Sequence, residues 1–260
     1  MRVPLPVRLL PPVAYRVWFT PPRPGARAIE RDADRLKTVE PITVTVNGGD
    51  RPGFVTGEGP LVILAHGWGG RAAQMLDLAL SAARNGYRAV AIDSPGHNTD
   101  EQRTSDGFQM AAGLEAVEVR FGPPAALVTH SLGAMTAVMA FGDRPPGAVV
   151  WLAPVLDLRE ALQLFAHRAK LAPWTTQALQ RRVKRFTGER WPVLTAGADT
   201  ELPRAELLVV HDPADPDASF DTPRLHWPSD DHVRAWLTLP VWATTRYCGI
   251  PASSKRSSVS

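Results

Sequence analysis

The feature that most constrains this chain is a repeated pattern of a short apolar run, a polar turn rich in glycine, and a helical stretch. The apolar runs are Leu61–Ala65, Arg88–Ile92, Ala125–Thr129, Ala148–Leu152 and, after an interruption, Leu207–Val210. Runs of this kind are typical of strands buried on both faces, and strand–helix alternation favours a parallel sheet with right-handed crossovers. We therefore predict an α/β fold, in which a mostly parallel sheet is flanked by helices.

The segments between these runs predict the remaining elements. We expect helices over Arg71–Arg84, Ser105–Val119 and Leu132–Phe141. Before the first run, the β-branched alternation of Glu40–Val46 predicts a half-buried strand, and residues 53–56 are its expected hairpin partner. Near the other end, Arg224–Trp227 predicts a last short strand and Val233–Leu237 the start of a helix.

The alternation also divides the chain into segments. Residues 1–38 carry many prolines and are expected to form an irregular lead-in. The α/β core then comprises residues 39–156 and 191–250, interrupted by a helical insertion over residues 157–190. Within that insertion, Leu158 and Leu162 recur at helical spacing, as do Leu179 and Val183. The Ser-, Lys- and Arg-rich tail, residues 251–260, is expected to be disordered.

Composition limits the functional classes. The only cysteine, Cys248, excludes an internal disulfide and a site with several thiolates, and it suits a cytoplasmic location. The net charge of the 260 residues is +3, with +5 in residues 157–190 and −2 elsewhere, so a general nucleic-acid binder is disfavoured. Residues 121–142 lack charge, but Pro123-Pro124 and Thr129-His130-Ser131 favour a strand, a turn and a buried helix over a membrane span.

Polar residues follow four of the predicted strands, at the edge where open parallel sheets bind ligands. The third of these turns, Thr129-His130-Ser131-Leu132-Gly133, places a serine between a strand and a helix rich in small residues. Such a serine sits on a sharp turn with its hydroxyl exposed, and it needs small residues two positions before and after it. Gly133 satisfies this requirement, whereas Thr129 stands where glycine is usual; a buried serine that caps the helix is the alternative interpretation.

A serine nucleophile requires a base and an acid that orients the base. Asp215 follows the Leu207–Val210 strand and His232 comes 17 residues later, giving the order Ser, Asp, His. Asp212 is closer to the strand end and suits a turn, and Asp157 is a second-choice acid. His226 alternates within a predicted strand, so the loop position of His232 favours it as the base.

The remaining site residues surround this serine. The amide of Leu132 is a candidate donor to a developing oxyanion, and the loop after Leu61–Ala65 offers the amide of Trp68 as the second. Gly67 and His130 are predicted to line the substrate site. The glycines of this loop also suit a tight strand-to-helix turn, and no nucleotide-binding glycine motif is present.

Four stretches together resemble the α/β-hydrolase-fold serine hydrolases: L-V-I-L-A-H-G-W-G-G, V-A-I-D-S-P-G-H, L-V-T-H-S-L-G-A-M and L-L-V-V-H-D-P-A-D. This resemblance implies that Ser131 is the nucleophile, Asp215 the acid, His232 the base, and Trp68 and Leu132 the oxyanion donors. It also implies that no metal or organic cofactor is needed, and that the insertion after the sixth strand is a helical cap over the site. The connection of eight residues between Asp215 and the predicted last strand is shorter than the family's crossover.

The expected function is therefore that of a serine esterase, which cleaves small to medium carboxylic esters through an acyl-enzyme. A thioesterase or acyltransferase would use the same triad, and a non-catalytic protein that binds a small apolar ligand is the alternative from another class. The basic run at residues 181–185 of the cap either attracts an anionic partner or is the solvated face of a helix.

Overall fold

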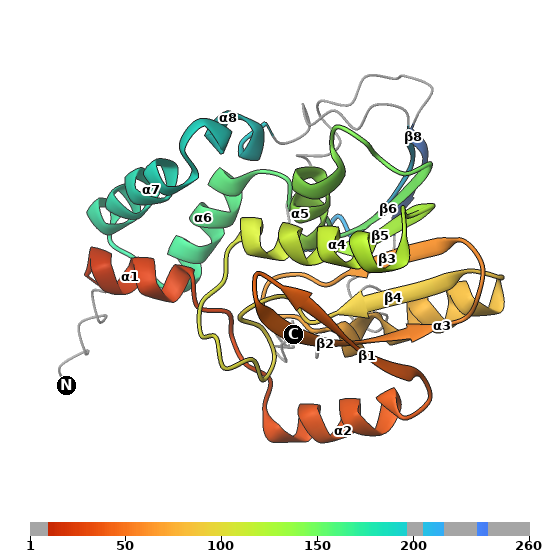
Figure 1. Cartoon of the computed structure of the whole chain (residues 1–260). Helices are drawn as coiled ribbons and strands as arrows, with labels where there is room; N and C mark the ends of the chain where they lie inside the picture. The colour runs from red at the N-terminus through yellow and green to blue at the C-terminus, as the bar shows by residue number, and fades with distance from the viewer. Residues whose placement is uncertain (1–9, 197–204, 216–232, 239–260) are drawn as a thin grey trace, which may run out of the picture.

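The computed structural model describes residues 10–196, 205–215 and 233–238, and in the last of these ranges the backbone alone. An eight-stranded sheet with the order β1-β2-β4-β3-β5-β6-β7-β8 forms the centre of the molecule (Figure 1). The strands are β1 Glu40–Val46, β2 Gly49–Thr56, β3 Leu61–Ala65, β4 Arg88–Ile92, β5 Ala126–His130, β6 Ala148–Leu152, β7 Glu206–His211 and β8 Val233–Thr238. β1 and β2 pair antiparallel, as do β2 and β4, and all pairs from β4 to β8 are parallel.

The first two strands form the predicted hairpin, although β2 is longer than expected. The turn residues Asn47 and Gly48 both have positive φ, 51° and 79°, which is the conformation of a two-residue hairpin loop. Val46 and Gly49, on either side of this turn, therefore form the first antiparallel pair of the hairpin. The register continues from there to the pair of Glu40 and Val55.

The central strands are buried because helices cover both faces of the sheet. Ile63 and Val90 point into a core cluster with residues of α4 (Gly107–Phe121) and α5 (Leu132–Phe141). Val62 and Ala89 point to the other face, where they pack against η1 (Ala72–Met75) and α3 (Leu76–Arg84). Every side chain of β3 is buried, so the uninterrupted apolar run reflects contact on both faces, as predicted.

The segment predicted to be an irregular lead-in instead contains two helices, so that prediction is wrong for its described part. They are α1 Pro11–Trp18 and α2 Ala26–Leu36. Proline is accepted in the first turn of a helix, where its missing amide hydrogen has no helical partner, and α1 begins with two prolines. In α2, the buried Asp32 forms an ion pair with the buried Arg71, which anchors the helix to the start of η1.

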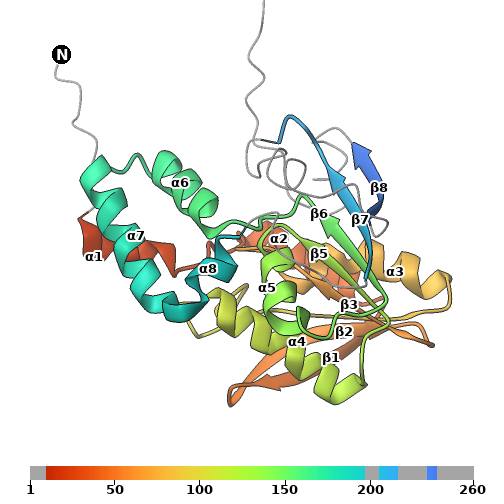
Figure 2. The same ribbon diagram turned by 90° about the horizontal axis from the view of Figure 1, so that it is seen from above.

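Between β6 and β7 the chain is helical, as predicted, although the helical segment continues past residue 190. Its elements are α6 Leu158–Arg168, α7 Pro173–Thr187, η2 Gly188–Arg190 and α8 Trp191–Leu194. Figure 2 shows α6, α7 and α8 together beside the sheet, with α1 against α7. Leu162, Leu179 and Val183 are buried in one cluster that also contains Met135 of α5 and is bordered by Trp18 of α1.

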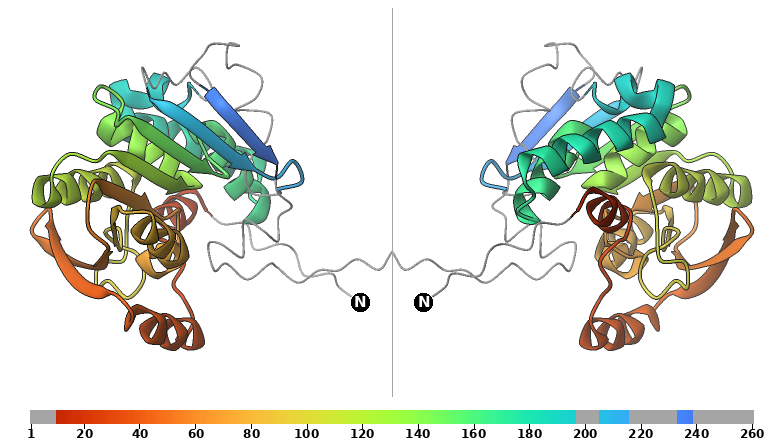
Figure 3. Two further views of the ribbon diagram at one scale, coloured as in Figure 1. Left: turned by 90° about the vertical axis from the view of Figure 1, so that its right-hand side faces the viewer. Right: turned by 90° about the vertical axis from the view of Figure 1, so that its left-hand side faces the viewer.

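The last strand differs from the prediction. Val233–Thr238 forms β8 rather than a helix, and it extends the sheet beside β7 (Figure 3). The predicted strand at Arg224–Trp227 and the tail after residue 250 lie outside the described residues. Because β8 begins at Val233, the connection after β7 comprises the 21 residues 212–232, which is long enough for a parallel crossover.

Candidate functional site

Ser131 occupies a sharp turn between β5 and α5. Its backbone angles are φ 53° and ψ −123°, a conformation that is strained for a residue with a side chain. Two backbone hydrogen bonds fix the turn: the Ser131 amide donates to the carbonyl of Leu152 at 2.9 Å, and the Val155 amide donates to the carbonyl of Ser131 at 3.1 Å. The serine is thus held by β6 and by the segment that follows β6.

Two glycines allow this turn to approach the end of β3. A Cβ atom on Gly133 would lie 2.9 Å from the carbonyl oxygens of Ala65 and His66. A Cβ on Gly67 would lie 2.8 Å from the Cβ of Ser131 and 3.1 Å from the carbonyl oxygen of His130. The structure therefore brings the predicted site residues Gly67, His130 and Ser131 together.

Replacing Gly133 should weaken the fold. The clash in Gly133→Ala involves backbone atoms that cannot rotate away, so we expect the free energy of unfolding to fall by about 2 kcal/mol. The matched control is Gly113→Ala in α4, where the new Cβ would make an ordinary contact of 3.5 Å with Ile92. Because alanine favours a helix, the control should be stabilised by up to about 1 kcal/mol. Urea unfolding of both variants measures the difference, and equal stabilities would contradict the close approach.

Thr129, which stands where a glycine is usual, fits into the interior of the sheet. Its side chain is fully buried, and its Oγ1 lies 3.4 Å from the carbonyl oxygen of Val150. In the strand register it stands between Ala65 of β3 and Trp151 of β6. The threonine therefore fills space between strands, and the turn at Ser131 still forms.

The two predicted oxyanion donors come from separate parts of the chain. Leu132 begins α5, and Trp68 lies in the loop after β3, where the amide of Gly70 donates to the carbonyl of Gly67 at 3.0 Å. Within the described residues, neither the Trp68 amide nor the Leu132 amide donates to a loop or turn carbonyl. Gly69 has φ 70° and lies against Pro22 of the N-terminal segment.

His66 connects this loop to the loop after β4. Its Nε2 accepts a hydrogen bond from the Ser94 amide at 3.0 Å, so its Nδ1 carries the proton and donates to the Gly67 carbonyl at 2.8 Å. Burial lowers the pKa of His66 to about 4, which keeps the ring neutral. His66 is therefore structural in the described geometry, since both of its nitrogens are occupied.

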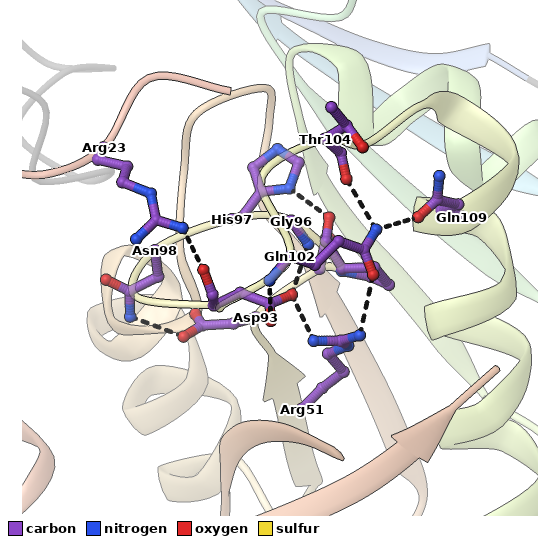
Figure 4. A network of polar contacts seen from close by, with 12 residues as sticks. Arg23, Arg51, Asp93, Gly96, His97, Asn98, Gln102, Thr104 and Gln109 are labelled. Carbon is purple, nitrogen blue, oxygen red and sulfur yellow. Dashed lines mark hydrogen bonds and ion pairs between the residues drawn. The ribbon is translucent and has the colours of Figure 1, made fainter. Parts of the chain in front are cut away.

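A polar network holds the loop after β4 in place (Figure 4). Asp93 accepts hydrogen bonds from the Ala72 amide at 2.6 Å and from Asn98 at 2.7 Å. Desolvation nevertheless raises the pKa of Asp93, and these two hydrogen bonds oppose that shift. Asp93 thereby connects the end of β4 to η1.

Asp100 is the second centre of the network. Its carboxylate pairs with Arg51 of β2 and accepts the Gly96 amide at 2.7 Å, while its carbonyl accepts a hydrogen bond from Arg23. Desolvation raises the pKa of Asp100, but the bonds from Gly96, Gln102 and Arg51 outweigh it and lower the pKa below its usual value. The N-terminal segment and β2 are thus both attached to this loop.

His97 is buried between this loop and the candidate oxyanion loop. Its ring lies 5.1 Å from that of Trp68, edge to face, and 5.1 Å from that of His66. Its Nδ1 lies 3.0 Å from the Pro95 carbonyl, and its Nε2 has no hydrogen-bond partner within the described residues. Burial and the nearby His66 lower the pKa of His97 to about 3.

These shifts predict a loss of stability in acid. Because the folded-state pKa values of His66 and His97 lie below the ordinary 6.5, the unfolded chain binds protons first as the pH falls. The stabilisation is complete above pH 6.5 and is lost as the pH falls, by about 1.4 kcal/mol per pH unit for each histidine, down to about 4 for His66 and about 3 for His97. Urea unfolding at several pH values should show a shallower slope for His97→Gln than for His167→Gln, an exposed control on α6. Identical pH dependence of stability in the two variants would contradict the lowered pKa of His97.

The three candidate acids are in different environments. Asp157 begins α6, where its carboxylate accepts the Arg159 amide at 2.7 Å and pairs with the Arg159 guanidinium. Asp212 is buried and accepts the Ala214 amide at 2.7 Å, as expected of a turn residue. Asp215 lies beyond this turn, its amide 3.0 Å from the Asp212 carbonyl and its side chain half-buried. Ser131 and Asp215 therefore follow the carboxyl ends of parallel strands at one edge of the sheet.

The structure does not describe the predicted base. His226 and His232 lie outside the described residues, but Val233, the neighbour of His232, pairs with Leu207 near the start of β7. The amino end of β8 thus lies at the opposite ends of the strands from Ser131, separated along the strand direction by about 17 Å, the length of a strand of six residues. The sequence after Thr238 contains no histidine. Of the described histidines, His130 is adjacent to Ser131, and desolvation lowers its pKa to about 4.

The contacts between the loops could not be predicted from the sequence. Asp93 and His97 belong to one of the four strand-end motifs, whereas no motif includes Asp100, and no spacing rule predicts which loop each of the three contacts. Among the described residues no group of three or more His, Cys, Asp and Glu side chains is arranged to bind a metal ion. No described helix has the length and apolar character needed to cross a bilayer.

Solved structures with the same fold are numerous. A bacterial membrane phospholipase A superimposes with a TM-score of 0.57 at 15% identity, over 81% of this chain and 82% of its own. An esterase from Pyrococcus furiosus gives 0.55 at 17% identity, over 80% and 82%. An α/β hydrolase fold protein from Nakamurella multipartita gives 0.51 at 18% identity, over 82% and 95%. At these identities the similarity establishes the fold alone.

In sequence, no curated protein matches the chain. Residues 62–252, however, match the alpha/beta hydrolase family, which covers most of the chain and all of the strand-end loops described above. The fold and the sequence match agree with the resemblance carried by the four strand-end motifs. The chain belongs to the alpha/beta hydrolase family, and its fold is that of a hydrolase.

Proposed function

We propose that the protein is a serine hydrolase that cleaves carboxylic esters through an acyl-enzyme. Ser131 Oγ attacks the ester carbonyl, and His232 takes its proton and returns it to the leaving alcohol. Asp215 holds the imidazole in the correct tautomer, and the amides of Trp68 and Leu132 stabilise the oxyanion. Water, deprotonated by the same base, then cleaves the acyl-enzyme and frees Ser131.

The conformation of Ser131 is the observation that carries this proposal. A positive φ at a serine costs free energy, and it persists because the Leu152 and Val155 bonds and the two glycine contacts hold it. A serine that only caps a helix needs no such strain, and here no side-chain cap bond is formed. We further propose that the helices within residues 157–190 form a cap over the site, and that the protein works in the cytoplasm, where its lone cysteine stays reduced.

Labelling with a fluorophosphonate probe tests the nucleophile without a choice of substrate. We expect peptide mass spectrometry to find one adduct, on Ser131, and to find none in His232→Gln. Labelling of Ser94, another serine at a strand end, is not expected, because its backbone carries no positive φ. An adduct on Ser131 that persists in His232→Gln would still identify Ser131 as the nucleophile, but it would assign the role of base to another residue.

The start of β8 favours a second candidate, a protein that binds a small apolar ligand without turnover. Since Val233 lies at the opposite ends of the strands from Ser131, a triad built with its neighbour His232 requires the chain before β8 to reach across the sheet. Absence of any adduct on folded protein, together with saturable binding of an apolar ester by Ser131→Ala, would favour this candidate.

A further inference from the structure

The outer face of α1 exposes an apolar stripe. Leu10, Val13 and Val17 are 59%, 45% and 43% exposed, and their spacing of three and four residues places them on one side of the helix. The adjoining side of α1 is packed: Ala14 is fully buried, and Trp18 lies edge to face with Phe165 of α6. The stripe is therefore on the outside of a helix that is already anchored to the protein.

α7 lies beside α1 and presents positive charge. Arg182 is 3.9 Å from the centre of the Tyr15 ring, and one turn further along both helices Phe186 packs edge to face with Phe19. The two helices therefore run side by side in the same direction, as Figures 1 and 2 show. Exposed Trp174 lies on α7 in line with Arg181, seven residues later.

The charge on this surface has a single sign. Together α1 and α7 contain five cations and no carboxylate: Arg16, Arg181, Arg182, Lys184 and Arg185. Within the described residues, none of the five forms an ion pair. We call the exposed side chains of these two helices the α1–α7 face.

We propose that the α1–α7 face binds the surface of a phospholipid bilayer that carries anionic headgroups. Lysine and arginine are attracted to anionic lipid, by about 1 kcal/mol each near the surface, while aliphatic side chains and tryptophan enter the headgroup boundary. A nucleic acid or an acidic protein would also attract the cations, but neither has an apolar layer for Leu10, Val13 and Val17 to enter. The combination of aliphatic stripe and unpaired cations therefore favours lipid.

Cosedimentation of the full chain with vesicles tests this face. We expect binding to vesicles of equal parts phosphatidylcholine and phosphatidylglycerol, weakened by salt, and little binding to phosphatidylcholine alone. Arg181→Gln with Arg185→Gln should lower the partition coefficient about 25-fold, as two charges at about 1 kcal/mol each imply. Val13→Gln with Val17→Gln should lower it about tenfold by removing apolar contact.

Matched variants elsewhere separate this surface from a general charge effect. Arg27→Gln with Arg84→Gln removes the same charge from exposed positions on α2 and α3, and Val119→Gln removes an exposed valine from α4. Both should bind as the natural chain does. Ser131→Ala should also bind normally, so failure of the esterase proposal leaves this test intact.

Three outcomes would overturn the proposal. The first is no binding to the anionic vesicles at low salt, and the second is an equal loss of binding in the Arg27/Arg84 control. The third is a dimer in solution that Val13→Gln with Val17→Gln converts to monomer without any vesicle binding, because the α1–α7 face would then pair two copies of the chain.

Discussion

Replacement of Ser131 by alanine is expected to remove ester hydrolysis, with kcat falling on the order of 10⁶-fold. The reason is chemical: alanine has no hydroxyl to form the acyl-enzyme, while the close approach of Gly67 and the hydrogen bonds of the turn involve Ser131 only through its Cβ and backbone. Because alanine meets the same strain at φ 53° as serine does, the free energy of unfolding should be nearly unchanged. Hydrolysis of p-nitrophenyl acetate, followed with urea unfolding, measures both quantities.

Two further variants show whether the strain serves the nucleophile. Ser131→Gly should be equally inactive but more stable by about 1 kcal/mol, since glycine adopts this backbone conformation without cost. Ser94→Ala, at the end of β4, should retain activity, because the hydrogen bond to His66 uses the Ser94 amide and not its hydroxyl. Full activity in Ser131→Ala would end the proposed mechanism.

The sequence predicted the centre of the sheet accurately because burial on both faces leaves a strong pattern. β3, β4 and β6 have the predicted bounds, and α5 begins and ends where the small-residue pattern indicated. The same local signals predicted the turn at Ser131, where the serine directly follows the strand and Gly133 comes two residues later. Elements that are determined by a few adjacent residues could therefore be predicted from the sequence.

The sequence predicted the two ends of the chain poorly, because tertiary contacts determine them. The helix expected at Val233–Leu237 is a strand, since pairing with β7 overrides a short and ambiguous apolar pattern. The lead-in forms helices because Asp32 pairs with Arg71 and Trp18 packs on Phe165, contacts between residues far apart in sequence. The preference for His232 over His226 rests on a strand predicted at Arg224–Trp227, which lies outside the described residues, and on a helix expected at Val233–Leu237, which is a strand.

The identity of the acid is the second large prediction. Asp215→Asn should lower kcat about 10⁴-fold, because an amide that replaces the orienting carboxylate favours the wrong imidazole tautomer. Asp157→Asn is the matched control: the residue follows the neighbouring strand β6, but its carboxylate caps α6 and pairs with Arg159. Asparagine also caps helices well, and Arg159 is half exposed, so this change should cost less than about 1 kcal/mol of stability and leave kcat unchanged.

The comparison of these two aspartates also tests how the site is assembled. If kcat falls in Asp215→Asn but not in Asp157→Asn, the orienting acid lies after β7, and the base must approach Ser131 from that side of the sheet edge. The reverse result would place the acid at the start of α6. Because Arg159 occupies the Asp157 carboxylate, that arrangement requires the Arg159 pair to open on substrate binding, and Arg159→Gln would then raise kcat. Equal activity in both variants would mean that Ser131 works without an orienting carboxylate at either strand end.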